Sequence, residues 1–202
     1  MNFCPSCGAA VVRRIPAGDH LPRDVCSACG AGLVRRVPDG DHLPRLVCAR
    51  CGEIHYQNPK LIAGCVPEYR GSILLCRRAI EPRRGYWTIP AGFMEIGETL
   101  QQAAARECHE EALARVEVQD PCAIVHVLWS AQVHVLFRAT IAEPSWGAGV
   151  ESLEVRLCEE REIPWPQLAF PSVIFTLERW FADRAAGRRG LHFTTVERPP
   201  AG

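Results

Sequence analysis

The sequence predicts an α+β protein in two parts, a small cysteine-rich module followed by a larger mixed domain. The 11 cysteines of the 202 residues are spread unevenly, because six of them lie within residues 1–51 as Cys-x-x-Cys pairs. The remainder combines short apolar runs with a segment of strong helix formers, which is typical of a mixed domain. With 48% apolar residues the chain can build a conventional core, so a disulfide scaffold and a disordered chain are both excluded.

The N-terminal part contains a repeat with a step of 22 residues. Its motif is Cys-x-x-Cys-Gly, and the three copies begin at Cys4, Cys26 and Cys48. Two such pairs supply four thiolates for a tetrahedral zinc ion, and the 18 residues between consecutive pairs fit a zinc ribbon. A thioredoxin-like redox pair is the alternative, but that would be one pair beside a βαβ unit rather than three pairs among prolines and glycines.

Six thiolates fill one four-ligand site and leave one pair over. We expect the pairs next to the second domain to form the site. The expected zinc ligands are Cys26, Cys29, Cys48 and Cys51, and Cys4 and Cys7 are an alternative pair. His20 and His42 could replace a cysteine as ligands, but both lie beside a repeated Gly-Asp, where a role in a turn is the simpler explanation. Four thiolates leave no position for water, so the site is expected to be structural. The expected boundaries are 1–25 for an extra repeat and 26–57 for the zinc ribbon.

The second domain is expected over residues 58–186, with a flexible tail over 187–202. The predicted elements are strands over 61–67, 72–77 and 86–89, a loop with two glycines over 91–98 and a helix over 100–114. Thr99 and Gln102 form a capping box that begins the helix. A final helix that begins at Pro171 carries apolar residues at helical spacing, which predicts packing in the core or in a homodimer interface.

Three glutamates share one face of the predicted helix over 100–114. Glu107, Glu110 and Glu111 are related by i+3 and i+4 spacing. Like charges at this spacing destabilise a bare helix by roughly 0.2–0.5 kcal/mol per pair, and no lysine lies between them. A divalent cation would compensate, and oxygen ligands select a hard ion such as Mg²⁺ or Mn²⁺. The apolar side, from Leu100 to Ala112, would pack the helix on the sheet.

The spacing of these carboxylates and of the residues before them resembles a family signature. It is similar to the Nudix box, Gly-x5-Glu-x7-Arg-Glu-U-x-Glu-Glu-x-Gly-U, in which U is a bulky aliphatic residue. The six matching positions are Gly92, Glu98, Arg106, Glu107, Glu110 and Glu111. A chance match is expected on the order of once in 10⁵ chains of this length. Cys108 and Ala114 stand at the two U positions, and Leu113 replaces the glycine, which puts the turn after the helix in question.

This resemblance extends over residues 26 to about 185 and implies a Nudix α/β/α sandwich with a mixed sheet. It implies hydrolysis of a nucleoside diphosphate linked to another group, with ADP-ribose and FAD-like dinucleotides as the favoured substrates. The implied ligands of Mg²⁺ or Mn²⁺ are Glu107, Glu110 and Glu111, and Gly92, Glu98 and Arg106 complete the implied catalytic set. A non-catalytic ligand sensor is an alternative from another class, although such sensors usually lose the box glutamates that this chain keeps.

NADH pyrophosphatase activity is a second alternative within the family. Those enzymes carry a Ser-Gln-Pro-Trp-Pro-Phe-Pro-x-Ser array shortly after the box. Here Pro164-Trp165-Pro166 and Phe170-Pro171-Ser172 are separated from each other and lie about fifty residues downstream. We therefore interpret the similarity of this segment as incidental.

Further candidates for the site flank the box. Tyr86 and Trp87 would stack on a base at about 1–3 kcal/mol per stack, although core packing explains them equally well. Arg78 is a candidate for contact with phosphates, and Glu151 and Glu154 are candidates for the catalytic base.

Charge and hydropathy bear on partners and location. The 23 Lys and Arg residues balance 23 Asp and Glu residues, so net charge gives no reason to expect a nucleic acid or a membrane as partner. The first residues show no secretory signal, and the most apolar segment, 123–137, is too short to cross a bilayer. We expect a cytoplasmic protein whose partner is a small nucleotide.

Overall fold

The computed structural model describes residues 2–3, 10–11, 13–14, 23–26 and 28–198, and the chain divides into units over 1–58 and 59–202. This division falls one residue after the expected end of the zinc ribbon. Cys4, Cys7 and His20 lie outside the described residues, so their expected roles as ligands stay predictions.

Short strands build the first unit. The strands are β1 (Asn2–Phe3), β2 (Ala10–Val11), β3 (Arg13–Arg14), β4 (Arg23–Asp24), β5 (Leu33–Arg36), β6 (Arg45–Cys48) and β7 (Ile54–His55). Strands β5, β6 and β7 form an antiparallel sheet, in which Leu33 lies opposite Cys48. Gly30 and Gly52 follow the second and third cysteine pairs and have φ angles of +70° and +75°, a conformation that glycine adopts at little cost.

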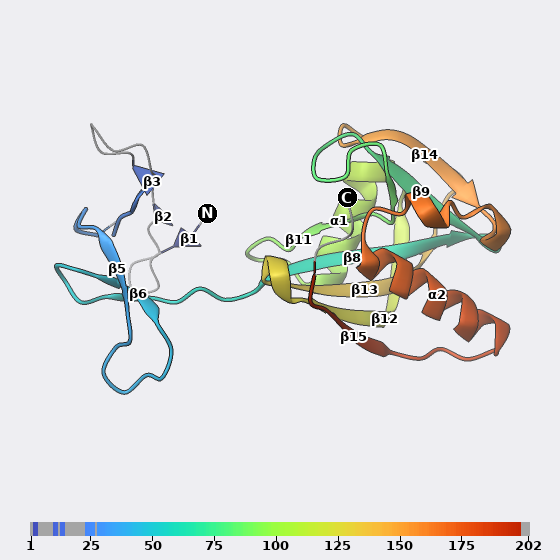
Figure 1. The fold of residues 1–202 in the computed structure, drawn as a ribbon. Helices are drawn as coiled ribbons and strands as arrows, with labels where there is room; N and C mark the ends of the chain where they lie inside the picture. The colour runs from blue at the N-terminus through green and yellow to red at the C-terminus, as the bar shows by residue number, and fades with distance from the viewer. Residues whose placement is uncertain (1, 4–9, 12, 15–22, 27, 199–202) are drawn as a thin grey trace. The chain divides into compact units, whose positions relative to one another are not determined.

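A mixed sheet of eight strands forms the centre of the second unit (Figure 1). Its strands are β8 (Lys60–Tyr69), β9 (Ser72–Arg78), β10 (Trp87–Thr88), β11 (Ala91–Phe93), β12 (Val116–Val127), β13 (Gln132–Ile141), β14 (Ser152–Cys158) and β15 (His192–Val196). The main order is β10-β9-β8-β13-β12-β15, while β11 pairs with β8 and β14 with β9. Strand β13 runs parallel to β8, and β15 runs parallel to β12, whereas the other pairs are antiparallel.

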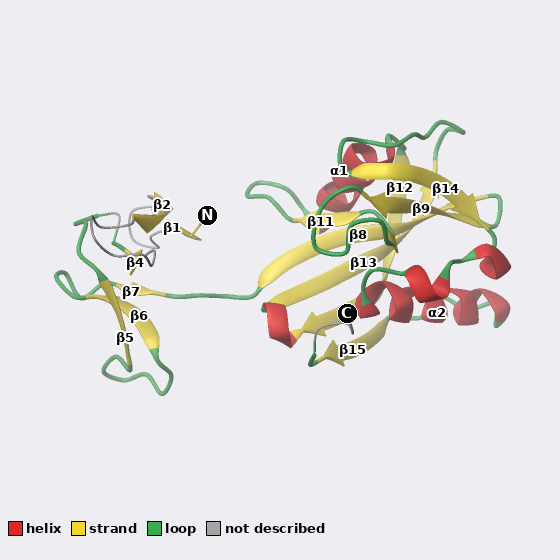
Figure 2. Ribbon diagram, turned by 45° about the horizontal axis from the view of Figure 1, so that its top comes forward, coloured by secondary structure: helices red, strands yellow, loops and turns green. Residues whose placement is uncertain are grey.

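Two helices cover opposite faces of this sheet (Figure 2). Helix α1 (Leu100–Ala112) lies on one face and α2 (Pro171–Ala185) on the other; η1 (Leu128–Ser130), η2 (Glu160–Glu162) and η3 (Trp165–Gln167) are short 3-10 turns. Alternate residues of β9 enter different cores, since Ile73 and Leu75 pack with α2 while Leu74 and Cys76 pack with α1. The predicted α/β/α sandwich is therefore confirmed.

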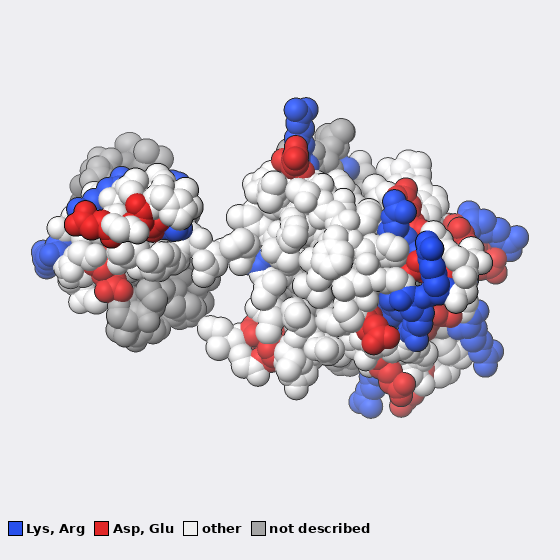
Figure 3. All heavy atoms as spheres, turned by 90° about the horizontal axis from the view of Figure 1, so that it is seen from below, with Lys and Arg blue, Asp and Glu red and all other residues white. Residues whose placement is uncertain are grey.

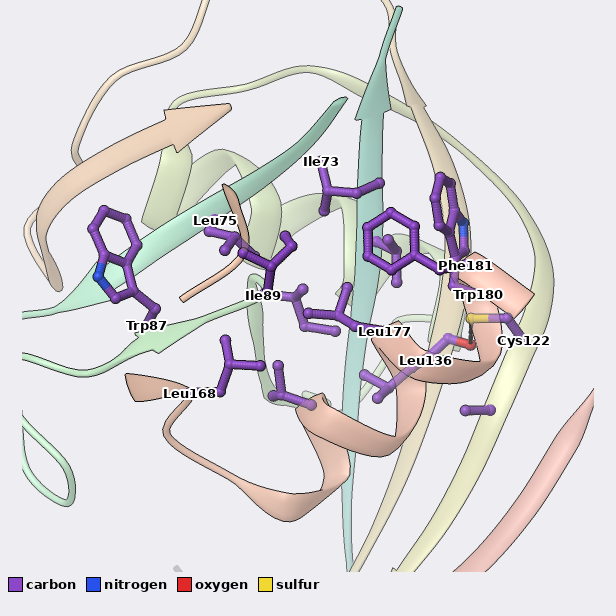
Figure 4. Packing of buried hydrophobic residues seen from close by; sticks show 14 of the residues in the cluster. Ile73, Leu75, Trp87, Ile89, Cys122, Leu136, Leu168, Leu177, Trp180 and Phe181 are labelled. Carbon is purple, nitrogen blue, oxygen red and sulfur yellow. Dashed lines mark hydrogen bonds between the residues drawn. The ribbon is translucent and has the colours of Figure 1, made fainter. Parts of the chain in front are cut away.

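The core beneath α2 is rich in aromatic side chains (Figure 4). Val173, Leu177, Trp180 and Phe181 of α2 are buried in it, and the rings of Trp180 and Phe181 meet edge to face with centroids 5.0 Å apart. The apolar side of the final helix thus packs in the core of its own domain, which is one of the two roles that the sequence predicted for it.

Helix α1 begins as predicted and ends two residues early. The Oγ of Thr99 accepts a hydrogen bond from the Gln102 amide, and the Gln102 side chain accepts one from the Thr99 amide. The helix ends at Ala112 because Leu113 has a φ of 50°, in the left-handed region. The chain thus makes the turn for which the Nudix box uses glycine, at a cost for a residue with a β-carbon of roughly 1–2 kcal/mol.

Leu113→Gly is expected to have a free energy of unfolding about 1 kcal/mol higher than that of Leu113→Ala, because glycine removes this backbone strain. Leu113 is 48% exposed, so both variants also lose the burial of about half a leucine side chain. Urea unfolding followed by tryptophan fluorescence measures the change. Leu113→Ala is the matched control, because it shortens the side chain and keeps the strain. Equal stability of the two variants would contradict this explanation.

The expected flexible tail over 187–202 is wrong for residues 192–196, which form β15 along β12. A buried ion pair anchors this strand. Arg138 donates to Asp183 Oδ2 at 2.8 Å and to the Gly190 carbonyl at 2.9 Å, and Asp183 also accepts from the Gly190 amide and lies 3.0 Å from Nε2 of His192. The sequence did not reveal the anchor because Arg138 lies 45 residues from Asp183.

Asp183→Asn is expected to lower the free energy of unfolding by about 3–5 kcal/mol, because it leaves the buried Arg138 without its counter-charge.

The same ion pair predicts a dependence of stability on pH. Burial alone would raise the pKa of Asp183, but hydrogen bonds, led by that from His192, outweigh burial and hold the pKa at about 2, below the ordinary 3.8. This stabilisation is present above pH 4 and lost as the pH falls towards 2, in the wild type but not in the variant. Urea unfolding between pH 2 and pH 4 and at neutral pH tests both expectations, with Asp120→Asn at an exposed position as the control. A similar loss of stability in Asp183→Asn and Asp120→Asn would contradict the role of the Arg138–Asp183 ion pair.

Charged side chains of both signs are interspersed on the face of the second unit shown in Figure 3. This agrees with the balanced composition. Among the described residues, no helix combines the length and apolar character that crossing a bilayer requires.

Candidate active site

A cleft of about 1010 Å³ opens in the second unit, on residues of α1, α2, β8, β11, β13 and the loops between strands. Five of the six residues that match the Nudix box line it, namely Gly92, Arg106, Glu107, Glu110 and Glu111. Its volume reaches the upper end of the range for small-molecule sites, which is about 300–1,000 Å³.

Two of the carboxylates on α1 are held in a poorly solvated environment. Glu111 is only 7% exposed, and its Oε2 has no hydrogen-bond partner among the described residues. Burial, reinforced by the charge of Glu107, raises the pKa of Glu111 to about 8. Burial also raises the pKa of Glu107, against the lowering effect of Arg106. A β-carbon at position 92 would lie 2.3 Å from the Glu107 carboxylate, so any side chain there would displace that carboxylate.

Arg106 connects the glycine loop to the helix. Its guanidinium donates to both oxygens of Glu98 at 2.8 and 3.1 Å, and to Glu107 at 2.8 Å and Glu110 at 3.0 Å. It also donates to the carbonyl of Phe93 at 3.0 Å. Arg106 lowers the pKa of Glu98, which therefore stays charged and pairs with the arginine instead of lining the cleft.

The structure separates the two candidates for the catalytic base. Glu151 lines the cleft and its charge acts on Glu107, Glu111 and Arg78. Glu154 lies outside the cleft lining and pairs with Arg77 at 3.7 Å.

The loop before Glu151 is fixed on the end of α1. Gly149 donates to the Glu111 carbonyl at 3.0 Å, and a β-carbon at Gly149 would lie 1.8 Å from the Glu110 carbonyl oxygen. The Glu151 carbonyl in turn accepts from the Ala79 amide at 2.8 Å. Glycine thus allows the close approach that brings Glu151 to the carboxylates.

Of the other candidates, only Arg78 lines the cleft. Its guanidinium lies 5.0 Å from the centroid of the Phe170 ring, and burial lowers its pKa against the raising effect of Glu111 and Glu151. Trp87 is 5% exposed in the core beneath α2 (Figure 4), and neither it nor Tyr86 is part of the lining. The structure therefore places Trp87 in the core, which is the alternative that the sequence left open, whereas the half-buried ring of Tyr86 lies against the Arg83 guanidinium, 4.2 Å from the ring centroid.

Part of the cleft lining was not predicted from the sequence. Trp129 lies in η1, the turn between β12 and β13, Gln132 and His134 lie at the start of β13, and Phe93 lies on β11. The only signal in the sequence was the polar pair Gln132 and His134 at alternate positions of an apolar strand. The segment Phe170-Pro171-Ser172, interpreted above as incidental, also lines the cleft.

A cluster of four thiols lies in the first unit. The sulfur atoms of Cys26, Cys29, Cys48 and Cys51 are all within 4.8 Å of one another. The distance between sulfur atoms is 3.3 Å for Cys29 and Cys48, 3.9 Å for Cys29 and Cys51, and 4.0 Å for Cys26 and Cys51. A tetrahedral zinc ion with Zn–S bonds of about 2.3 Å separates sulfurs by about 3.8 Å, so the cluster fits zinc.

Two family models match the chain. The one described as NUDIX domain matches residues 59–180, and the zinc-ribbon model described as Nudix N-terminal matches twice, at 2–31 and 26–57. The double match reflects the repeat in the sequence.

Solved structures share the architecture. A crystal structure of a NUDIX hydrolase from Nitrosomonas europaea is 48% identical and superposes with a TM-score of 0.84, covering 86% of this chain and 99% of that one. An ADP-ribose pyrophosphatase from Streptococcus suis shares the fold at 20% identity and a TM-score of 0.52, covering 70% of this chain and all of that one.

Curated relatives match over shorter stretches. An NAD-capped RNA hydrolase NudC from Edwardsiella ictaluri is 38% identical over 78 residues, 39% of this chain and 29% of that protein. An ADP-ribose pyrophosphatase from Methanocaldococcus jannaschii is 38% identical over 56 residues, 28% of this chain and 33% of that protein. The matches thus span a third or less of these relatives. Together with the domain match over 59–180 and the fold, they show that the chain belongs to the Nudix hydrolase family.

Proposed function

We propose that this protein hydrolyses the diphosphate bond of a nucleoside diphosphate linked to a second moiety, with Mg²⁺ or Mn²⁺ as cofactor. ADP-ribose and FAD-like dinucleotides are the proposed substrates. The observation that carries the proposal is the convergence of Glu107, Glu110, Glu111 and Glu151 on one cleft that is large enough for a nucleotide.

The carboxylates of α1 fit a hard divalent cation. Glu111 presents a buried oxygen without a partner among the described residues, and Glu107 and Glu111 both have raised pKa values because burial disfavours their charges. Glu107, Glu110 and Glu111 would hold the cation. When bound, it would neutralise charge on the diphosphate and lower the pKa of an attacking water.

The remaining residues of the cleft position the substrate and move a proton. Arg106 and Glu98 fix the glycine loop against α1, and so hold Glu107 and Glu110 in place. Arg78 would bind a phosphate oxygen, because its guanidinium faces the same cleft and is fixed by the Pro82 carbonyl at 2.8 Å. Glu151 would accept the proton of the attacking water.

An NADH pyrophosphatase is the second candidate, and one observation favours it. The segment Phe170-Pro171-Ser172, which resembles part of the array of those enzymes, lines the cleft beside Arg78. Curated relatives named NAD-capped RNA hydrolase add to this. We further propose that the protein acts on a small nucleotide in the cytoplasm. A homodimer is the proposed alternative to a monomer for the state of the protein itself.

Release of nucleoside monophosphate from ADP-ribose, FAD and NADH tests the function. We expect turnover of at least one substrate with Mg²⁺ or Mn²⁺, and loss of turnover in Glu110→Gln. Glu154→Gln is the matched control, because Glu154 is an exposed glutamate outside the cleft. No turnover across the panel, or full activity of Glu110→Gln, would overturn the hydrolase in favour of a ligand sensor.

We also propose a structural zinc ion in the cysteine cluster, and expect about one tightly bound zinc per chain. Metal analysis should show that Cys48→Ser loses it and that Cys158→Ser, a buried thiol of the second unit, keeps it. Two zinc ions per chain would mean that the first repeat takes part in a further site.

A further inference from the structure

The cleft has two chemically different ends. The charged residues lie on α1, at the end of β9 and at Glu151, whereas the turn between β12 and β13 contributes Trp129 and the adjoining start of β13 contributes Gln132 and His134. A diphosphate with its cation would engage the charged end, which leaves the second end to another part of the substrate.

A row of side chains crosses three strands at this second end. Phe93 on β11 pairs in register with Ile62 on β8, which pairs with His134 on β13. Register partners point to the same face of a sheet, and two strand spacings separate Phe93 from His134 by about 10 Å. This span is comparable with the width of a nucleobase, and Ile62 forms an apolar floor between the two rings.

Two aromatic side chains of the cleft are about half exposed, and the Lys60 ammonium lies 5.0 Å from the centroid of one of them, Phe93. Trp129 is 47% exposed and Phe93 is 49% exposed. Single exposed apolar residues are common on protein surfaces and need no explanation. Here, however, both rings line the same cleft as the polar pair Gln132 and His134, and aromatic rings together with hydrogen-bonding groups suit a flat heterocycle.

The polar pair offers one donor and one acceptor. Nε2 of His134 lies 3.0 Å from Oε1 of Gln132. Burial lowers the pKa of His134 to about 4, so its imidazole is neutral at pH 7 and donates this hydrogen bond. The Nδ1 of His134 remains as an acceptor and the Gln132 amide nitrogen as a donor. The edge of a nucleobase presents the complementary groups.

From this juxtaposition we propose that the β12–β13 turn is the base-binding subsite of the cleft. Trp129 and Phe93 stack on the base, and Gln132 and His134 hydrogen-bond to its edge. This inference rests on the proposed function, since it assigns the nucleoside half of the same substrate. It replaces the earlier assignment of base stacking to Tyr86 and Trp87.

Binding of AMP and of ribose 5-phosphate to the full chain tests the subsite, because the two ligands share a phosphorylated ribose and differ by the base. In Trp129→Ala, the Kd of AMP should rise by about 5- to 100-fold, the loss of one base stack, while that of ribose 5-phosphate stays within twofold. His134→Phe, which keeps a ring but no acceptor, should raise the Kd of AMP by about 2- to 10-fold. Phe193→Ala is the matched control, an exposed aromatic of β15 outside the cleft lining.

Calorimetry gives these constants without turnover, and circular dichroism confirms that each variant is folded. An equal loss for both ligands, an unchanged Kd of AMP, or AMP binding too weak to measure in the wild type would overturn the subsite. The two proposals fail separately. If AMP binding depends on Trp129 but no diphosphate is cleaved, only the hydrolase is overturned. If diphosphates are cleaved and AMP binding is independent of Trp129, only the subsite is overturned.

Discussion

Glu111→Gln is expected to abolish most of the metal-dependent activity and at the same time to stabilise the metal-free protein. The activity should fall on the order of 10³-fold, the effect of removing several kcal/mol of metal-derived stabilisation of the transition state. The buried Oε2 of Glu111 is suited to a cation, and glutamine replaces this anionic ligand with a neutral amide.

The gain in stability follows from the raised pKa of Glu111. Burial raises this pKa from 4.5 to about 8, so between these values the folded state binds a proton that the unfolded state has released. The wild type therefore loses stability as the pH rises from about 4.5 to 8, and Glu111→Gln does not. At pH 9 the variant should be more stable by on the order of 3–5 kcal/mol, whereas at pH 4.5 the two should be similar.

Urea unfolding at pH 5 and pH 9 without added Mg²⁺ or Mn²⁺ measures this difference. All five tryptophans lie in the second unit, so their fluorescence reports on that unit. Glu110→Gln is the control on the same helix, because its side chain is 56% exposed and pairs with Arg106. It should lose activity without gaining stability at pH 9. If Glu111→Gln were no more stable than the wild type at pH 9, a cost of burying this charge would be ruled out.

The local parts of the fold were predictable from the sequence. The capping box at Thr99, the cysteine spacing and the carboxylate face of α1 depend on residues a few positions apart, and each was found where it was expected. The family resemblance supplied the sheet and its two layers of helices.

The parts that the sequence did not reveal depend on contacts between distant segments. Strand β15 is anchored by Arg138 and Asp183, and the cleft brings the β12–β13 turn to α1. Trp87 is a residue for which the sequence suggested a role in the site and the structure shows a role in the core. Its neighbourhood in the sequence suggested a ligand, but its partners in space are apolar core residues from α2 and the sheet (Figure 4). The periodicity of apolar residues identifies which face of an element is buried. Whether a side chain on that face lies in a core or lines a cleft depends on how elements distant in the sequence pack against it.

Glu151 and Glu154 were equal candidates for the catalytic base in the sequence, but only Glu151 lines the cleft. Glu151→Gln is expected to lower kcat by about 10²- to 10⁴-fold, because it removes the proposed proton acceptor from the cleft. Glu154→Gln should stay within twofold of the wild type, since Glu154 is exposed and pairs with Arg77. The two variants remove the same charge from positions three residues apart. A difference in kcat between them therefore reports the effect of lying in the cleft and not the loss of a negative charge as such.

Two further measurements separate a base from a metal ligand at Glu151. For a base, Glu151→Gln keeps the Mn²⁺ concentration that gives half-maximal activity, and the residual rate loses the acidic limb of its pH profile. For a metal ligand, the half-saturating Mn²⁺ concentration rises instead. Glu151→Asp should recover part of kcat in the first case, because a carboxylate remains within reach of the cleft. If Glu151→Gln retained full activity, or if Glu154→Gln lost as much, the proton acceptor would have to be sought on another element, and the fixing of residues 147–151 on the end of α1 would serve the fold alone.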